Sequence, residues 1–150
     1  MTRVSIGVWA LVAAISASSA TSQEQKASVT SVAAGQVWRY KARAQEPASR
    51  VLILLVERDA KLGEIVHIRV SGLHLKGPKG ETSQVGHLPY QSESLRSSLL
   101  SLEARDKPVP PDYQGGYKEW KQAFDSGKAG VFTVPLFELL NGFEKAPGGR

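Results

Sequence analysis

The stretch RVLILLVERDAKLGEIVHIRV, residues 50–70, decides the fold of this chain. Its first part, residues 51–56, is a run of six apolar residues with a charged residue on each side, which predicts a strand covered on both faces. Residues 59–63 end in a glycine and fit a hairpin connection. Beyond them, Val66 and Ile68 alternate with His67 and Arg69, as in a strand with two different faces. The sequence therefore predicts an antiparallel hairpin, with its first strand central in a sheet.

Further strands are expected on both sides of this hairpin. Residues 36–43 alternate between the aromatic side chains of Trp38 and Tyr40 and a largely charged face. Residues 72–76 lead into the turn sequence GPKG at 77–80, and residues 81–88 can return as another strand, although they contain few β-forming residues. Together these segments predict an antiparallel meander of about four to five strands.

The second half of the chain changes to helical spacing. Ser92 is expected to cap a first helix that runs toward Lys107 and ends before the prolines at 108, 110 and 111, with leucines 95, 99, 100 and 102 at helical intervals. A second helix carries Tyr117, Trp120 and Phe124 and stops at Gly127. A third helix follows Thr133 and buries residues 136, 139, 140 and 143. The expected fold class is α+β, in which the meander is followed by about three helices packed on one face.

The first twenty residues predict export. Arg3 precedes an uncharged, mostly apolar run at 4–15, and the small residues at 16–20 place Ser18 and Ala20 at the −3 and −1 positions of a cleavage site. We expect a signal peptide at 1–20 that is cut after Ala20, a flexible leader at 21–34, a single α+β domain at 35–144 and a frayed tail at 145–150. An uncleaved anchor is the alternative, but the apolar run is shorter than the roughly twenty residues that span a bilayer. The expected location is periplasmic or extracellular, without stable membrane insertion.

Composition excludes several classes of function. The chain has 150 residues, which suits one domain. It has no cysteine, and this rules out a disulfide scaffold, a thiolate metal site and a cysteine nucleophile. The formal net charge of +5 is mild, and no stretch concentrates lysine and arginine, so nucleic acid is not an expected partner. No cofactor is expected.

The three histidines, His67, His74 and His87, are the candidate metal ligands and general bases. Their spacings match no ligand motif, so a metal site is a weak candidate. In one unbroken strand His67 and His74 would point to opposite faces, whereas a bulge at Ser71 and Gly72 would bring them to the same face. No serine motif for nucleophilic catalysis occurs, and we assign no catalytic residue.

The loop at 108–116, PVPPDYQGG, has no periodicity that would bury its aromatic residue Tyr113. A proline-rich loop that displays an aromatic side chain suits contact with a protein or a sugar. We therefore select Tyr113, Gln114, Tyr90 and His87 as candidate binding residues.

Several motifs resemble those of a small family of uncharacterised exported bacterial proteins. They are GQVWRY at 35–40, GEIVHI at 63–68, SGL at 71–73, GYKEW at 116–120 and GKAGVFT at 127–133. The resemblance covers roughly residues 35–143. It implies one intact domain and no known activity, so it carries no functional residue over to this chain.

Three functions are consistent with these observations. The first is a non-enzymatic, exported protein that binds another protein of the cell envelope, in the manner of an inhibitor or immunity protein. The second is a small periplasmic hydrolase that uses a histidine with an aspartate or glutamate. The third is an accessory subunit of an envelope complex. The oligomeric state does not follow from the sequence.

Overall fold

A computed structural model of the chain describes residues 31–145. The predicted signal peptide at 1–20, most of the predicted leader and the tail from residue 146 lie outside the described residues. Within 31–145, no helix combines the length and the apolar character that crossing a bilayer requires.

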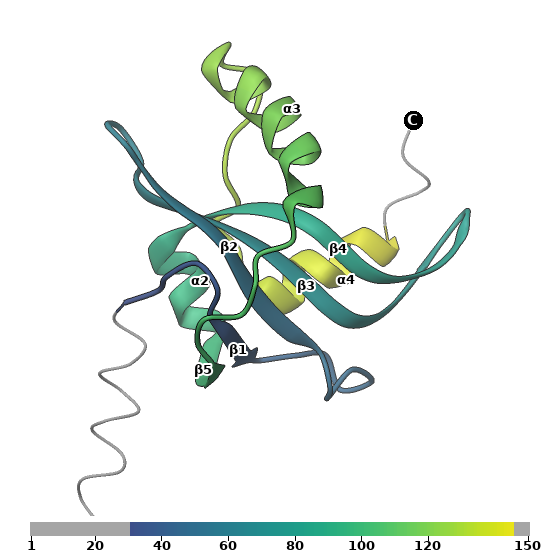
Figure 1. The fold of residues 1–150 in the computed structure, drawn as a ribbon. Coiled ribbons are helices and arrows are strands. Elements are labelled where there is room, and N and C mark those ends of the chain that lie inside the picture. Colours follow the sequence, from purple (N-terminus) through teal and green to yellow (C-terminus); the bar gives the residue numbers. More distant parts are fainter. Residues whose placement is uncertain (1–30, 146–150) are drawn as a thin grey trace, which may run out of the picture.

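The centre of the fold is a five-stranded antiparallel sheet in the order β4-β3-β2-β1-β5 (Figure 1). Its strands are β1 (Val37–Tyr40), β2 (Arg50–Asp59), β3 (Gly63–Gly77), β4 (Gly80–Gln91) and β5 (Leu99–Ala104). The predicted hairpin of β2 and β3 is present, with Asp59 paired to Gly63 at its turn. On β2, the successive residues Ile53 and Leu54 are both buried, as expected for a central strand covered on both faces. The predicted α+β class with an antiparallel meander is confirmed.

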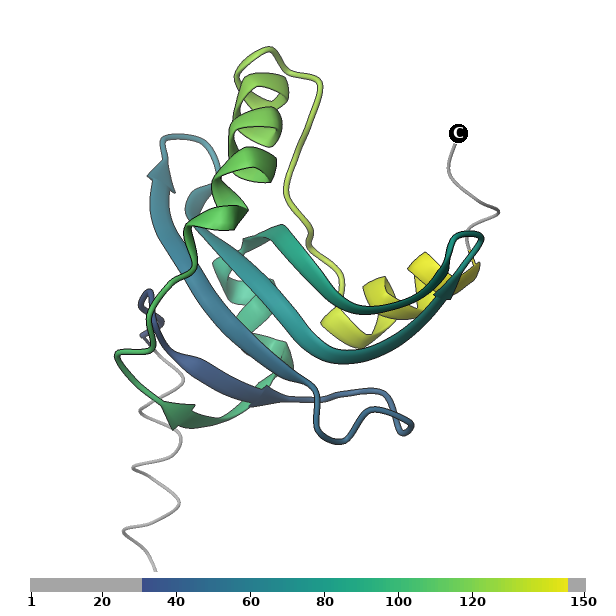
Figure 2. The ribbon, with the colours of Figure 1, turned by 45° about the vertical axis from the view of Figure 1, so that its right-hand side comes forward.

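A bulge in β3 changes which residues face the core. Ile68 and Val70 are buried before it, whereas Leu73 and Leu75 are buried after it, so the parity of the buried side chains switches at Gly72. Gly72 has a positive φ of 71°, and a Cβ there would lie 3.0 Å from the Cα of Ser49, so the position requires glycine. Beyond the bulge, the long β3–β4 hairpin curves alongside the C-terminal helix (Figure 2).

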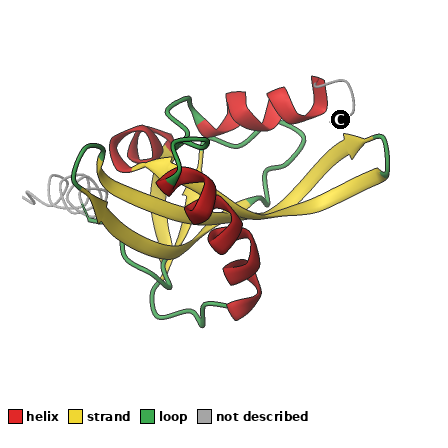
Figure 3. Cartoon of the chain, turned by 90° about the horizontal axis from the view of Figure 1, so that it is seen from above, coloured by secondary structure: helices red, strands yellow, loops and turns green. Residues whose placement is uncertain are grey.

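The helices cover both faces of the sheet. They are α2 (Ser92–Ser98), the short 3-10 helix η1 (Pro111–Tyr113), α3 (Gln114–Asp125) and α4 (Leu136–Lys145). Leu95 of α2 and Leu136 and Leu140 of α4 join the hydrophobic core. The expectation of one shared face is met by α2 and α4, whereas α3 lies against the opposite face, where it contacts His67 of β3 (Figure 3). We call these the core face and the α3 face.

The expected first helix is much shorter than its leucine pattern suggested. It ends at Ser98, and residues 99–104 form β5, which pairs with β1 through contacts such as Tyr40 with Leu99 and Trp38 with Leu102. Its N-cap is Gln91 rather than Ser92, whose hydroxyl is instead bonded to Glu64. A leucine-rich segment can form either a helix or a strand. Here the segment forms a strand because the edge of β1 supplies hydrogen-bond partners for its backbone.

The core face carries the apolar interior. Its cluster also includes Val32, so the packed domain begins upstream of Gly35, inside the segment predicted as a flexible leader. The other members come from every strand and from α2 and α4: Trp38, Tyr40, Val51, Ile53, Val66, Ile68, Val70, Leu73, Leu75, Leu88, Tyr90, Leu95, Leu99, Leu136 and Leu140.

A buried arginine, Arg43, joins α4 to this face. The guanidinium of Arg43 donates to both oxygens of Glu46, and both side chains are almost completely buried. Arg43 also reaches Glu144 of α4 at 2.7 Å, and Glu46 accepts a hydrogen bond from the backbone N–H of His74. These contacts lower the pKa of Glu46, with the bond from Arg43 as the main cause.

Candidate functional site

The α3 face of the sheet is polar where the core face is apolar. On β3, the residues between Val66, Ile68 and Val70 are His67 and Arg69, and both are buried beneath α3 or the segment that leads into it. A buried histidine and a buried arginine require hydrogen-bond partners, because an unpaired polar group inside a protein is destabilising. Those partners define the candidate site.

Glu57, His67 and His87 form a continuous hydrogen-bonded row, which we call the histidine chain. His67 Nε2 lies 2.9 Å from Glu57 Oε1, and His67 Nδ1 lies 2.8 Å from His87 Nε2. The planes of the two imidazole rings are nearly parallel, inclined by 11°, and their centroids are 5.1 Å apart. The histidine chain runs from β2 across β3 to β4, so it spans three neighbouring strands.

Aromatic side chains of α3 cover the histidine chain. The centroids of Tyr117 and Trp120 lie 5.1 and 4.8 Å from that of His67, and both rings meet it edge-on. The Tyr117 hydroxyl donates to Glu57 Oε2 at 3.0 Å, so both carboxylate oxygens of Glu57 have a donor. These aromatic side chains leave His67 with no exposed surface, whereas His87, at the β4 end of the histidine chain, stays half-buried.

Burial keeps both imidazoles neutral near pH 7. Desolvation lowers the pKa of His67, and the bond to Glu57 opposes this effect only in part. Desolvation also lowers the pKa of His87, to about 4, and the neighbouring His67 adds to the shift. Burial and then the bond to Glu57 raise the pKa of Tyr117, so its hydroxyl stays protonated as a donor.

Four aromatic side chains follow one another from the end of η1 along α3. We call them the aromatic row: Tyr113 of η1 and Tyr117, Trp120 and Phe124 of α3. Neighbouring rings are in contact, with centroid distances of 6.5, 5.9 and 4.7 Å along the row. No residue of α3 is fully buried, and the helix stands out from the sheet (Figure 2). The aromatic row is therefore half-covered by the sheet and half-open to solvent.

The ends of α3 are held in different ways. At the start, Arg69 Nη2 lies 2.6 Å from Asp112 Oδ1 of η1, and its Nε donates to the carbonyl of Gly86 at 3.4 Å. At the other end, Gly127 has a φ of 75°. Its N–H donates to the carbonyl of Phe124, and the N–H of Lys128 donates to the carbonyl of Ala123. This is the glycine stop predicted for the second helix. The segment that follows returns along β4, where Phe132 bridges to Tyr90.

Three of the four candidate binding residues come together at the start of α3. Tyr113 contacts Tyr117, Gln114 is the exposed first residue of the helix, and His87 lies under Gly116 and Tyr117. Tyr90 is different, because its side chain has no exposed surface and belongs to the core. Its selection as a surface contact was therefore wrong: β4 continues to Gln91 and turns this ring inward.

The three histidines do not converge. The bulge at Gly72 does place His67 and His74 on the same face of β3, as its sequence suggested, but His74 lies on the far part of the strand and bonds to Glu81. His67 and His87 are in contact, and this pairing was not predicted. Within residues 31–145, no three His, Asp or Glu side chains are arranged to hold a metal ion.

Glu57 and Tyr117 are the members of the site that the sequence analysis missed. For Glu57 a signal existed in the hairpin turn: a five-residue connection at 59–63 sets Glu57 opposite Ile65, which makes His67 its diagonal neighbour on the same face. For Tyr117 the sequence indicated a helix face but gave no information about which side of the sheet that helix would cover.

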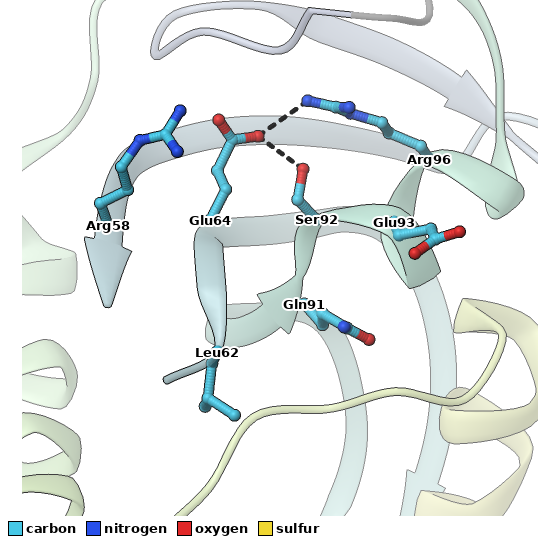
Figure 4. A pocket seen from close by; sticks show the side chains of 7 residues that line it. All are labelled: Arg58, Leu62, Glu64, Gln91, Ser92, Glu93 and Arg96. Carbon is cyan, nitrogen blue, oxygen red and sulfur yellow. Dashed lines mark hydrogen bonds and ion pairs between the residues drawn. The ribbon is translucent and has the colours of Figure 1, made fainter. Parts of the chain in front are cut away.

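A separate pocket of about 330 Å³ lies where the β2–β3 turn meets the start of α2 (Figure 4). Glu64 stands between Arg58 and Arg96, and its Oε1 accepts hydrogen bonds from Ser92 at 2.5 Å and from Arg96 at 2.8 Å. Glu93 adds a second carboxylate to the lining. Because the two arginines face two carboxylates, the pocket is charge-balanced and favours neither an anion nor a cation.

Comparisons of this chain with protein-family models, with curated proteins and with solved structures found no match. The site is therefore interpreted from its own geometry.

Proposed function

We propose that this is an exported protein that binds another protein of the cell envelope through the aromatic row and the start of α3. The observation that carries this proposal is the aromatic row itself: four neighbouring aromatic rings, three of them on the projecting helix α3, which buries none of its residues, and one at the end of η1. Partly exposed tyrosine and tryptophan are the residue types that dominate binding energy in protein interfaces. The export pattern of residues 1–20 supports a partner in the periplasm or outside the cell.

Rigidity supports this proposal. Tyr117 is fixed by its bond to Glu57, and Trp120 Nε1 donates to the carbonyl of Gly130 at 2.8 Å. Side chains that are already ordered lose little entropy when a partner covers them, so they contribute more to affinity. The role is that of an inhibitor or immunity-type protein, or of an accessory subunit if the partner is bound permanently.

The test is site-specific photo-crosslinking in the producing cell. A photo-reactive amino acid at Gln114, the exposed first residue of α3, is expected to give one discrete crosslinked product. The matched control is the same substitution at Gln45, an exposed glutamine in the loop between β1 and β2. Equal labelling from both positions, or none from Gln114, would contradict the proposal.

A second variant tests the aromatic row directly. Trp120→Ala is expected to weaken binding of the crosslinked partner by about 2 kcal/mol or more, since hot-spot tryptophans contribute that much. Lys118→Ala changes an exposed residue of the same helix and is expected to leave affinity within about threefold, because surface side chains outside hot spots contribute little. Isothermal titration with the purified partner measures both, and circular dichroism verifies that each variant is folded.

A further inference from the structure

The charged pocket beside the β2–β3 turn lies where the core face of the sheet changes from apolar to charged side chains. Val56 of β2 is paired with Val66 of β3, and two residues nearer the turn Arg58 is paired with Glu64. Alternation along a strand places Val56 and Arg58 on the same face. Val66 is buried in the core, whereas Arg58 and Glu64 line the pocket of about 330 Å³. This volume is within the range of sites that bind small molecules.

Arg58 and Glu64 stand opposite each other on antiparallel strands, where residues of opposite charge usually pair. Here the carboxylate turns to other donors, because Glu64 Oε1 accepts from Ser92 and from Arg96. Figure 4 shows Arg58 on the other side of this carboxylate from Arg96. Within residues 31–145, the side chain of Arg58 makes no ion pair and no hydrogen bond. Its guanidinium is therefore available to a ligand.

The other charged groups of the pocket also keep unused hydrogen-bonding capacity. Arg96 Nε is buried and has no acceptor among the described residues. Glu64 Oε2 and both oxygens of Glu93 accept no hydrogen bond from a side chain or backbone group between residues 31 and 145. In Figure 4, Glu93 lies at the opposite end of the pocket from Arg58, with Glu64 and Ser92 between them. The pocket thus presents an unpaired cation at one end and an unpaired anion at the other.

This arrangement selects the charge pattern of a ligand. An anion that binds Arg58 gains nothing from Glu93, and a cation that binds Glu93 gains nothing from Arg58. A ligand with a carboxylate at one end and an ammonium group at the other forms charge-assisted hydrogen bonds at both ends, which are about twice as strong as bonds between neutral groups. Between the two charges, Gln91 offers a neutral amide to polar groups in the middle of the ligand.

We propose that this pocket binds a short peptide with free ends, two or three residues long. Arg58 binds the terminal carboxylate, Glu93 binds the terminal ammonium group, and Gln91 faces the peptide amides. Leu62, which lines the pocket and is 41% exposed, favours a peptide with an apolar side chain. None of these residues belongs to the aromatic row or to the histidine chain, so this site goes beyond the proposed binding function and does not depend on it.

The first experiment is isothermal titration of the purified protein with the peptides Ala-Leu and Ala-Ala-Leu at low ionic strength, where exposed charges are least screened. A dissociation constant of about 1 mM or tighter is expected from the small size of these ligands. N-acetyl-Ala-Leu lacks the ammonium group and Ala-Leu amide lacks the carboxylate. Each is expected to bind about fivefold more weakly than Ala-Leu, which is the upper end of what a solvent-exposed ion pair contributes. No binding of either free peptide, or equal binding of the blocked forms, would overturn the proposal.

Two variants assign the ends of the peptide to their side chains. Arg58→Gln is expected to weaken binding of Ala-Leu by about fivefold but to leave binding of Ala-Leu amide unchanged, because the amide has no carboxylate to lose. Glu93→Gln is expected to weaken Ala-Leu by a similar factor and to leave N-acetyl-Ala-Leu unchanged. Unaltered binding of Ala-Leu in both variants would contradict the proposal. The matched controls are Arg105→Gln and Glu119→Gln, which remove the same charges from exposed positions outside the pocket.

Proton–nitrogen NMR spectra of the wild type locate the peptide without any substitution. Addition of Ala-Leu is expected to shift the amide signals of residues 58–64 and 91–96, which include every residue that lines the pocket. Shifts confined to residues 113–124 would place the peptide on the α3 face and overturn the proposal. Crosslinking from Gln114 and peptide binding beside Arg58 can each fail without the other, so the two proposals are tested separately.

Discussion

One arginine–carboxylate pair lies on each side of the sheet close to a helix, and the two pairs differ in burial. On the core face, Arg43 and Glu46 have side-chain exposures of 2% and 0%. On the α3 face, Arg69 is 9% exposed but its partner Asp112 is 66% exposed. Arg43 therefore holds a buried carboxylate beside α4, whereas Arg69 holds an exposed carboxylate in η1, directly before α3. The difference indicates that the buried pair contributes more to the free energy of unfolding than the exposed pair.

The largest expected effect comes from breaking the buried pair. Glu46→Gln leaves the guanidinium of Arg43 with reduced compensation in the interior, and we expect a loss of about 3–4 kcal/mol in the free energy of unfolding. Asp112→Asn removes the corresponding charge on the α3 face and is expected to cost about 0–1 kcal/mol, because an exposed partner is screened by water. Urea unfolding of both variants measures the contrast, and similar losses would remove the distinction between the faces.

The core face was predictable because its signals are local. Alternation in residues 64–70 and the apolar run at 51–56 identify the buried side chains without knowledge of their partners. The main failure, residues 99–104, arose where pairing with β1 outweighed a helical leucine pattern. Local periodicity does not contain that information, since the partner strand lies about sixty residues away in sequence.

The α3 face was predictable only in part, because its site is assembled from distant segments. His87 and Tyr113 were selected from local features, yet their proximity depends on the register of β4 and on the side of the sheet that α3 covers. The residues 80–91 contain few β-forming residues, so their register could not be inferred. His67 was identified as a titratable residue on a strand, but its partner His87 could not be assigned without that register.

The next effect in size concerns pH and separates the two faces again. On the α3 face, the native pKa of His87 is about 4, below the value of about 6.5 in an unfolded chain. Below pH 6.5 the unfolded state therefore binds a proton that the native state does not, so the contribution of His87 to stability is present above pH 6.5 and is lost as the pH falls toward 4.

Because His87 is partly open to solvent, we expect this loss to be about 1–2 kcal/mol between pH 7 and pH 4. In His87→Gln the loss of unfolding free energy between pH 7 and pH 4 should be smaller by that amount. Glu46, whose native pKa is lowered, loses its contribution only at lower pH, when the carboxylate takes up a proton. Unfolding curves recorded across the range test this order, and a loss unchanged in His87→Gln would show that the imidazole is not desolvated.

The smallest effect tests whether α3 begins where its contacts place it. Gly115 is helical, has no positive φ, and a Cβ there would meet nothing within 4 Å. Gly115→Ala is therefore expected to stabilise the protein by about 0.5 kcal/mol, because alanine restricts the unfolded chain without strain in the native one. Gly127→Ala makes the same change at the other end of the helix, where φ is 75°, and is expected to cost about 1 kcal/mol. The two glycines thus give opposite signs for one substitution, measured by thermal unfolding. Destabilisation by Gly115→Ala would mean that the chain is not helical at this point, and Gln114 would then not be the first residue of α3.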